Sequence, residues 1–325
     1  MYIEPTRPGV KRVLLFSGSS NQSLCRDIVS YLGIELGKVQ LSQFSNGEIY
    51  VRFAESVRGS DVFVVQTGAA PVNMHLMELL IMVDALKRAS AKRISAVIPH
   101  YGYARQDKKT QAREPITAKL VADLLQTAGA DRVLSMDLHA GQIQGYFDIP
   151  VDHLTALPVL VNYFREKNIP ELVVASPDVG RVKLAKKFSD KLGSGLAILH
   201  KTRPAHNRAE IGEIVGDVAG KAVLLVDDMI DTAGTLTEGA KTLIAHGAKE
   251  VYACATHPVL SGPAVERLRN SPIKEIIVTD TIPLSPEKRI EKIKVLSIAP
   301  IFAQTIKSVY EDESVSAIFE DDNLL

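Results

Sequence analysis

Side chains that could bind a charged ligand follow several short aliphatic runs in this chain. Each run is rich in β-branched residues, which is typical of a parallel strand buried on both faces. In open parallel sheets, ligands bind beyond the carboxyl ends of the strands. The imidazoles, carboxylates and cations at these ends therefore predict a polar ligand site. The segments concerned are His100–Asp107, Asp137–His139, Ser176–Asp178, His200–Arg203 and Asp227–Thr235.

The segment Ala222–Ile244 carries the strongest of these patterns. A buried strand, Val223–Val226, is predicted to end in the carboxylates Asp227 and Asp228, and the loop Asp231–Thr235 then opens a helix. Backbone N–H groups at a helix N-terminus bind phosphate. Carboxylates beside them suit sugar hydroxyls or a magnesium ion. The segment therefore predicts a sugar-phosphate site.

Within this loop, the hydroxyls of Thr232 and Thr235 can add donors, and Gly234 permits a close approach of the ligand. The alternative interpretation is an ordinary capped helix after an Asp-rich turn, and it stays open for any shorter piece of the string. A P-loop is excluded, because Ala240 stands where that motif needs lysine.

Short strands that alternate with amphipathic helices must position these side chains. This alternation predicts the α/β class, with mostly parallel sheets flanked by helices. The strands are too many for one sheet, so we expect a boundary near Ile149–Pro150 and domains of residues 1–150 and 151–325. The predicted strands are Val13–Phe16, Val62–Val65, Ile94–Ile98, Val133–Met136, Leu172–Val174, Leu196–Leu199, Val223–Val226, Val251–Ala255 and Ile276–Val278. The predicted helices are Leu76–Arg88, Pro115–Ala128, Thr155–Lys167, Val182–Leu192 and Thr235–His246.

The composition argues against several classes of function. The 325 residues include 38 Lys and Arg and 38 Asp and Glu, and this zero net charge argues against bulk binding to nucleic acid or to an anionic membrane. Cys25 and Cys254 are too few for a disulfide scaffold or a cysteine zinc site, and they fit a reducing compartment. No apolar run approaches the ~18 residues of a membrane helix. We therefore expect a cytoplasmic protein.

The string VDDMIDTAGTL (Val226–Leu236) resembles the phosphoribosyl-diphosphate (PRPP) motif of type I phosphoribosyltransferases. Nearly the whole chain resembles the bacterial-type class I ribose-phosphate diphosphokinases, or PRPP synthetases. This resemblance implies two type I phosphoribosyltransferase-like domains, with the C-terminal tail returning to the N-terminal one. The strings that carry it include FSNGE (Phe44–Glu48) and THPVLSGPA (Thr256–Ala264), and the most specific are GYARQDKK (Gly102–Lys109) and DLHAGQIQGYFDIPVDHL (Asp137–Leu154).

The resemblance implies transfer of the diphosphoryl group of ATP to the 1-hydroxyl of ribose 5-phosphate, which gives PRPP and AMP. Such a transfer gathers negative charge and needs cations and metal ions rather than a covalent nucleophile. The resemblance assigns Lys201 and Arg203 to catalysis, and His139 and Asp178 to Mg²⁺. Asp178 is the more ordinary ligand, since Mg²⁺ prefers oxygen.

The resemblance also implies binding residues and a homo-oligomer, typically a hexamer, whose ATP site is shared between subunits. The implied ATP-binding residues are Phe44, Asn46, Gly47, Glu48, Arg105 and Gln106. The implied ribose-5-phosphate residues are Arg203, Asp227, Asp228, Asp231, Thr232, Ala233, Gly234 and Thr235. The implied regulatory residues, for phosphate or ADP, are Ser56, Arg58, Ser314 and Ser316.

The chain departs from the family pattern in the loop that binds diphosphate. The pattern reads Asp-x-Gly-Gly-x-x-Arg-Ala, whereas here Arg181 replaces the second glycine and Leu184 replaces the arginine. Whether Arg181 or Lys183 supplies the missing charge stays open. Gln111 and Ala112 stand where regulated members often have a cation and a serine, which weakens the expectation of phosphate activation and ADP inhibition.

Two other functions compete with the diphosphokinase. An ordinary phosphoribosyltransferase that consumes PRPP would keep Asp227–Thr235 but has no use for GYARQD. A regulatory, non-catalytic synthetase-associated protein is the other alternative, although its loop region tends to carry inserts. PRPP-binding repressors fit poorly, because the chain shows neither a basic excess nor a helix-turn-helix segment.

Overall fold

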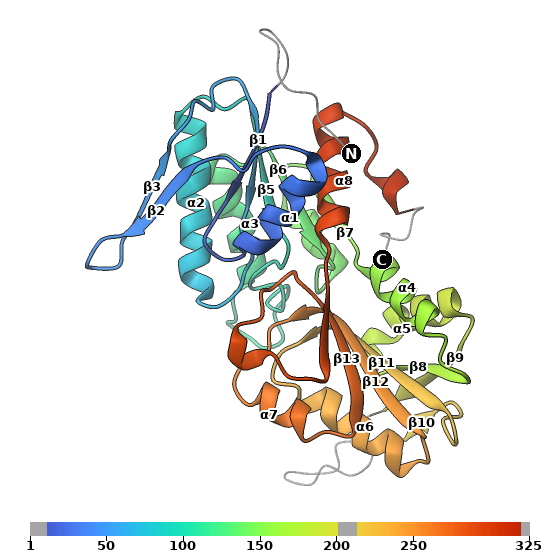
Figure 1. Ribbon diagram of the computed structural model, residues 1–325. Coiled ribbons are helices and arrows are strands. Elements are labelled where there is room, and N and C mark those ends of the chain that lie inside the picture. The colour runs from blue at the N-terminus through green and yellow to red at the C-terminus, as the bar shows by residue number, and fades with distance from the viewer. Residues whose placement is uncertain (1–11, 201–212, 320–325) are drawn as a thin grey trace. The chain divides into compact units, whose positions relative to one another are not determined.

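The computed structural model describes residues 12–200 and 213–319. Their contacts divide the chain into two compact units (Figure 1). The first unit takes the described residues up to Thr155, together with Thr281–Pro283 and the residues from Ser297 onward. The second unit takes those of Ala156–Asp280 and Leu284–Leu296. That these units correspond to domains of residues 1–150 and 151–325 stays a prediction.

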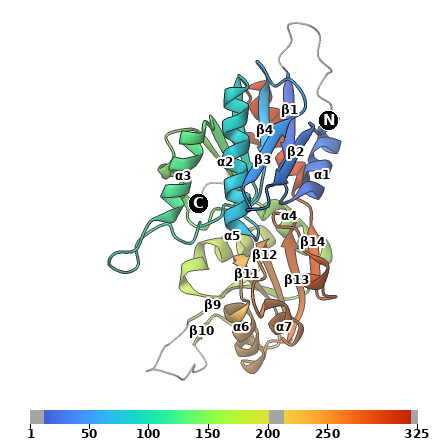
Figure 2. The ribbon, with the colours of Figure 1, turned by 90° about the vertical axis from the view of Figure 1, so that its left-hand side faces the viewer.

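The first unit is built on a five-stranded parallel sheet. Helix α2 packs against α3 and α1 packs against α8, so helix pairs cover both faces of the sheet (Figures 1 and 2). The strands, in spatial order, are β1 (Val13–Ser17), β4 (Asp61–Val65), β5 (Arg93–Ile98), β6 (Arg132–Met136) and β7 (Val151–Leu154). The helices are α1 (Gln22–Leu32), α2 (Val72–Arg88), α3 (Thr117–Ala128) and α8 (Ala299–Glu311).

An antiparallel ribbon extends from the first unit and stands apart from its sheet (Figure 1). Its strands are β2 (Val39–Gln43) and β3 (Ile49–Phe53), and their side chains alternate between half-buried and exposed positions, except at the end of β2. Neither of these two strands was predicted from the sequence. Both lack the continuous aliphatic run that marks a strand buried on both faces.

The second unit contains a seven-stranded sheet, parallel except where β10 pairs with β9. The strands, in spatial order, are β10 (Ile214–Val215), β9 (Gly195–Leu199), β8 (Leu172–Ser176), β11 (Ala222–Ile230), β12 (Glu250–Pro258), β13 (Ile273–Thr279) and β14 (Ile293–Leu296). The helices are α4 (Leu157–Lys167), α5 (Val182–Leu192), α6 (Gly234–Ala245) and α7 (Ala264–Arg269). Aliphatic side chains of β11, β12 and α6 form the core of this unit.

The α/β prediction is confirmed, and every predicted strand and helix lies on an element of the structure. Several strands are longer than expected, and β11 matters most: it continues to Ile230, so Asp227 and Asp228 lie within it rather than after it. The reason is that Met229 and Ile230 pair with His257 and Pro258 of β12 and extend the ladder.

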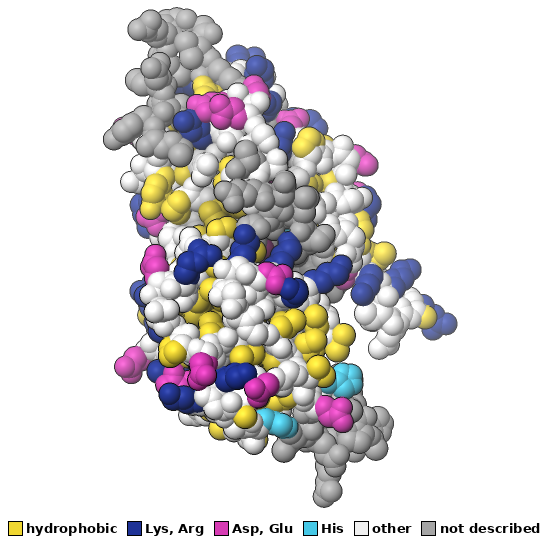
Figure 3. Space-filling model, turned by 90° about the vertical axis from the view of Figure 1, so that its right-hand side faces the viewer, with side chains coloured by type: hydrophobic (Ala, Val, Ile, Leu, Met, Phe, Trp, Pro, Cys, Tyr) yellow, Lys and Arg dark blue, Asp and Glu magenta, His cyan; other side chains and the backbone are white. Residues whose placement is uncertain are grey.

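Surface charge in the described part of the chain is mixed in sign. Figure 3 shows cationic and acidic side chains interspersed on one face, in keeping with the equal totals of 38 in the sequence. No helix among the described residues is long and apolar enough to cross a membrane.

The first unit has a close backbone contact at Gly68, just beyond β4. The Gly68 N–H donates to the carbonyl oxygen of His100 at 2.8 Å. A Cβ atom on Gly68 would lie 2.6 Å from the Gly102 nitrogen and 2.8 Å from its Cα. These are backbone atoms, so a side chain at position 68 would force the loop around Gly102 to move.

We therefore expect Gly68→Ala to lower the free energy of unfolding by about 1–3 kcal/mol, the usual cost of overpacking. Urea denaturation followed by circular dichroism measures this change. Gly145→Ala is the matched control, because a Cβ atom there has no neighbour within 4 Å. An equal loss in both variants would contradict the steric explanation.

Candidate functional site

Strand β11 of the second unit brings the predicted carboxylate pair next to a cation. The Arg181 Nε atom lies 3.2 Å from Asp227 Oδ1, and its Nη2 atom lies 3.0 Å from Asp228 Oδ1. The backbone N–H of Asp228 also donates to Asp227 Oδ1 at 2.8 Å. The pair is thus held by a side chain from the loop after β8, because β8 is the parallel neighbour of β11.

The electrostatics of this pair are unusual. Burial, followed by the neighbouring Asp228 carboxyl, raises the pKa of Asp227 from the ordinary 3.8 to about 8, and Arg181 offsets only part of this rise. Two buried carboxyls side by side cannot both ionise without cost. The pair therefore tends to keep a proton until further donors or cations arrive.

The loop after β11 has its own set of braces. The Ser261 hydroxyl bonds to the Asp231 carboxylate, and the Ser261 N–H donates to the Asp231 carbonyl at 3.0 Å. Arg267 Nη1 donates to the Thr232 carbonyl at 3.0 Å. Ala233 has a left-handed backbone with φ of 60°, and α6 begins at the next residue. The loop is therefore fixed in the form that presents a helix N-terminus to an anion.

Ser261 and Arg267 were missed by the reasoning from sequence. Both come from the segment after β12, some 30 residues beyond the loop that they hold. Ser261 lies in the string THPVLSGPA, which pointed to the family but not to a role. The spacing of residues along β11 cannot reveal hydrogen bonds that its loop receives from residues after β12.

The predicted metal ligands lie in different units. His139 follows β6 of the first unit, and Asp178 follows β8 of the second. The Asp178 carboxylate accepts a hydrogen bond from the Gly180 N–H at 2.8 Å. In residues 12–200 and 213–319 no group of three or more His, Cys, Asp or Glu side chains is placed to hold a metal ion. Joint ligation by His139 and Asp178 stays a prediction.

The FSNGE string forms the tip of the ribbon. The Phe44 N–H donates to the Glu48 carbonyl and the Gly47 N–H to the Phe44 carbonyl, both at 2.8 Å. Glu48 N donates to the Asn46 side chain at 3.2 Å, and Gly47 has φ of 91°. The Phe44 ring is 58% exposed, which is unusual for a core residue. The tip therefore presents an aromatic ring outward.

Arg105 and Gln106 lie in the loop between β5 and α3, and both side chains are exposed. The Thr117 hydroxyl, at the start of α3, bonds to the Gln106 side chain. Asp107 is buried and anchors the loop, since Gln142 donates to its carboxylate and Tyr146 to its carbonyl. The shared role of the ribbon tip and this loop in binding ATP stays a prediction.

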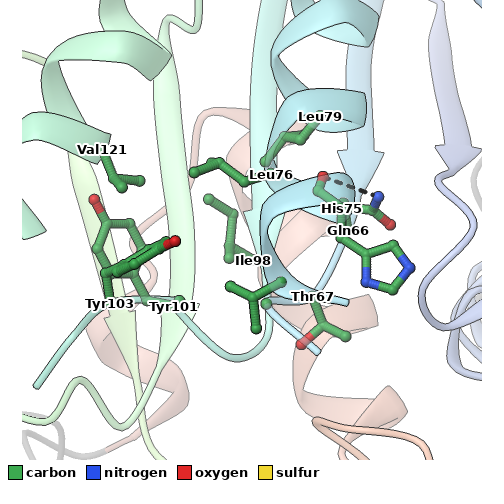
Figure 4. Close-up of a pocket in the computed structure, with 12 residues that line it drawn as sticks. Gln66, Thr67, His75, Leu76, Leu79, Ile98, Tyr101, Tyr103 and Val121 are labelled. Atoms are coloured by element: carbon green, nitrogen blue, oxygen red, sulfur yellow. Dashed lines mark hydrogen bonds between the residues drawn. The ribbon is translucent and has the colours of Figure 1, made fainter. Parts of the chain in front are cut away.

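A small cavity of about 20 Å³ lies beneath α2 in the first unit (Figure 4). Its wall is largely apolar, with Leu76, Leu79 and Ile98 facing the space. Its polar floor is already occupied: Gln66 donates to the Glu78 carboxylate at 2.6 Å and to the His75 carbonyl at 3.1 Å. No sequence prediction concerned this cavity, and its satisfied polar groups favour a packing role.

The predicted catalytic residues Lys201 and Arg203 lie outside the described residues. The chain on either side is described. The His200 N–H donates to the Glu213 carbonyl at 2.9 Å, beside the ladder of β9 and β10. The catalytic role of both residues stays a prediction.

Comparisons with known proteins bear on these patterns. A model described as the N-terminal domain of ribose phosphate pyrophosphokinase matches residues 13–129. A ribose-phosphate pyrophosphokinase of Clostridium acetobutylicum is 57% identical over 96% of this chain and 98% of its own length. One of Caldanaerobacter subterraneus is 60% identical over 94% of this chain and 97% of its own length.

The chain belongs to the ribose-phosphate pyrophosphokinase family. A crystal structure of phosphoribosylpyrophosphate synthetase from Mycobacterium smegmatis is 51% identical and superposes with a TM-score of 0.89, covering 93% of this chain and all of that one. The family resemblance and the fold expected from the sequence are thereby confirmed.

A second model matches the C-terminal part of this pyrophosphokinase-family chain. It is described as a phosphoribosyl synthetase-associated domain and covers residues 202–320. The full-length relatives at 57% and 60% identity carry the name of the enzyme. Their full-length match favours the catalytic interpretation over the regulatory one.

The predicted regulatory residues of this family lie on the first unit. Ser56 and Arg58 are exposed in the turn after β3, and the Ser314 and Ser316 hydroxyls, also exposed, lie 2.9 Å apart beyond α8. All four side chains are accessible to an anion. Their regulatory role stays a prediction.

We expect Asp227→Asn to remove one component of the pH dependence of stability. Between pH 3.8 and about 8, the folded protein keeps a proton on Asp227 that the unfolded chain has released. The free energy of unfolding of the wild type therefore falls as the pH rises through this window. Asn cannot ionise, so the variant gains stability over the wild type as the pH rises.

Urea denaturation at pH 5 and pH 8.5 measures this effect, with Asp190→Asn as the control. The Asp190 side chain is 58% exposed, so its removal should leave the slope unchanged. Parallel pH curves for the wild type and Asp227→Asn would show that the pKa of Asp227 is not raised.

Proposed function

We propose that the chain is an enzyme that transfers the diphosphoryl group of ATP to the 1-hydroxyl of ribose 5-phosphate, with PRPP and AMP as products. The observation that carries this proposal is the match, at 57% and 60% identity and over nearly the full length, to enzymes named ribose-phosphate pyrophosphokinase. The carboxylate pair and the braced loop of the second unit support it.

Ribose 5-phosphate binds to the second unit in this proposal. The N-terminus of α6 and the hydroxyls of Thr232 and Thr235 hold the 5-phosphate, because a helix start offers N–H groups and a positive dipole. The Asp227 and Asp228 carboxyls accept hydrogen bonds from the ribose hydroxyls. The braces on Asp231 and Thr232 fix the loop before the ligand arrives, so less ordering is needed on binding.

A magnesium ion is the cofactor that we propose. The Asp178 carboxylate is an oxygen donor of the kind that Mg²⁺ prefers, and His139 would complete the set. When bound, the ion offsets the negative charge of the phosphates. Lys201 and Arg203 supply further positive charge to the diphosphoryl group in the transition state.

ATP binds to the exposed loops of the first unit in this proposal. Phe44 and Arg105 can sandwich the adenine ring, with Asn46, Glu48 and Gln106 at its edge. The ribbon tip is exposed on its own subunit, so we propose that it completes the ATP site of a neighbour in a homo-oligomer, as in the hexamers of the family. We place this enzyme in the cytoplasm, as its cysteine usage suggests.

A regulatory role without catalysis is the second candidate, because the model that matches residues 202–320 is described as a synthetase-associated domain. One assay separates the two. ATP, ribose 5-phosphate and Mg²⁺ are supplied, and AMP and PRPP are measured. Formation of both products in equal amounts supports the proposed enzyme, whereas absence of AMP from folded protein leaves only the regulatory role.

We expect Lys201→Ala to lower kcat by at least ~100-fold, because it removes a charge that acts on the transition state. Steady-state kinetics with saturating ATP and ribose 5-phosphate measure this loss. Lys221→Ala is the control, since Lys221 pairs with Asp217 at the opposite end of β11 and should leave kcat unchanged. A near-normal kcat for Lys201→Ala would remove this residue from the catalytic set.

We expect a mixture of two impaired variants, Phe44→Ala and Lys201→Ala, to recover activity after subunit exchange. A shared site can then take its ribbon tip from one subunit and its lysine from the other. The activity of the mixture is compared with that of each variant alone. If the mixture shows only the average of the two, the ATP site lies within one subunit.

A further inference from the structure

The Arg181 side chain, in the second unit, contacts both carboxylates of the proposed ribose site. We propose that Arg181 is a positioning residue that holds Asp227 and Asp228 in the arrangement that binds the hydroxyls of ribose 5-phosphate. This inference rests on the proposed function, because it concerns the same substrate.

The fold places Arg181 at this point for a clear reason. Strands β8 and β11 are parallel neighbours, with Leu172 beside Ala222 and Ala175 beside Leu225. The loop after β8 therefore leaves the sheet beside the pair. Arg181 closes the short helical turn Val179–Arg181 and caps α5, which directs its side chain from a fixed backbone position.

The contact is shielded from water. The Arg181 and Asp227 side chains are each 19% exposed, and that of Asp228 is 7% exposed. Ion pairs on an open surface contribute little, but shielded ones resist screening by salt. Arg181 offsets part of the repulsion between two carboxyls at this depth, so loss of the cation would let the two side chains move apart.

The geometry requires a guanidinium rather than a simple cation. One Nε and one Nη atom address two carboxylates at once, at 3.2 Å and 3.0 Å. A guanidinium offers five donors in a fixed fork, whereas an ammonium is a point charge on a flexible stem. Both contacts use Oδ1 atoms, and a carboxylate has about four acceptor sites, so acceptor capacity remains for sugar hydroxyls.

The neighbouring residues of the same loop do not offer this contact. Leu184, one turn further along α5, carries no charge. Lys183 is exposed, and among the described residues no ion pair is seen between Lys183 and Asp227 or Asp228. In this loop it is thus Arg181, and not the residue at position 184, that places a positive charge on the carboxylates.

The test compares Arg181→Met, which keeps the length of the side chain but removes its charge, with Arg181→Lys, which keeps the charge but removes the fork. Lys186→Met is the control, because Lys186 is exposed on the same helix and pairs with Asp190. KM for ribose 5-phosphate, KM for ATP and the thermal midpoint are measured for all three. Calorimetry with ribose 5-phosphate alone gives binding without turnover.

We expect Arg181→Met to raise KM and Kd for ribose 5-phosphate by about tenfold, the effect of losing a hydrogen bond to a charged group. Arg181→Lys should recover part of this loss. KM for ATP should change less, and Lys186→Met should match the wild type. A lower thermal midpoint would show that Arg181→Met is poorly folded. In that case Arg181→Lys decides the question: its KM for ribose 5-phosphate should rise more than its KM for ATP.

Wild-type KM and Kd for ribose 5-phosphate in both Arg181 variants would overturn the inference. So would an equal rise in the KM values for both substrates, since that would indicate a general loss of structure. Failure of the proposed function looks different: the wild type would then form no AMP and would not bind ribose 5-phosphate in the calorimeter.

Discussion

The parallel pairing of β8 with β11 is the constraint on which the candidate site depends. This pairing ends both strands at the same edge of the second sheet, so the loop that carries Asp178 and Arg181 emerges beside the Asp227–Asp228 pair. The pairing of β11 with β12 adds the opposite side, from which Ser261 and Arg267 brace the next loop. The motif on β11 thus forms a site only together with residues that follow its two neighbouring strands, β8 and β12.

The sequence was a good guide to the elements buried on both faces. Continuous aliphatic runs such as Val62–Val65 and Ile94–Ile98 lie within single strands of the structure, and the helix Val182–Leu192 has the predicted bounds. The position of the PRPP motif between a strand and a helix was also foreseen. Only the end of the strand was misplaced, because the ladder with β12 continues past Asp227 and Asp228.

What could not be foreseen depends on contacts between distant residues. Nothing in the spacing of Arg181 indicates that its guanidinium bridges two carboxylates more than 40 residues later. The half-exposed ribbon behind Phe44 lacks the pattern of a buried strand, and the cavity beneath α2 is formed by side chains from several elements. The local sequence pattern predicts helices and strands. The site depends on which strands pair, because the pairing brings distant residues together.

The path of the chain between the units has a consequence for the order of events during synthesis. Arg93 of β5 pairs with Asp61 of β4 at 2.6 Å and with Asp312, beyond α8, at 2.7 Å. The first unit is therefore closed by residues that follow the last strand of the second unit, which ends at Leu296. On the ribosome, the second unit can complete its core while the α1 face of the first still waits for α8. The first unit, whose strands come first in the chain, is thus completed after the second unit.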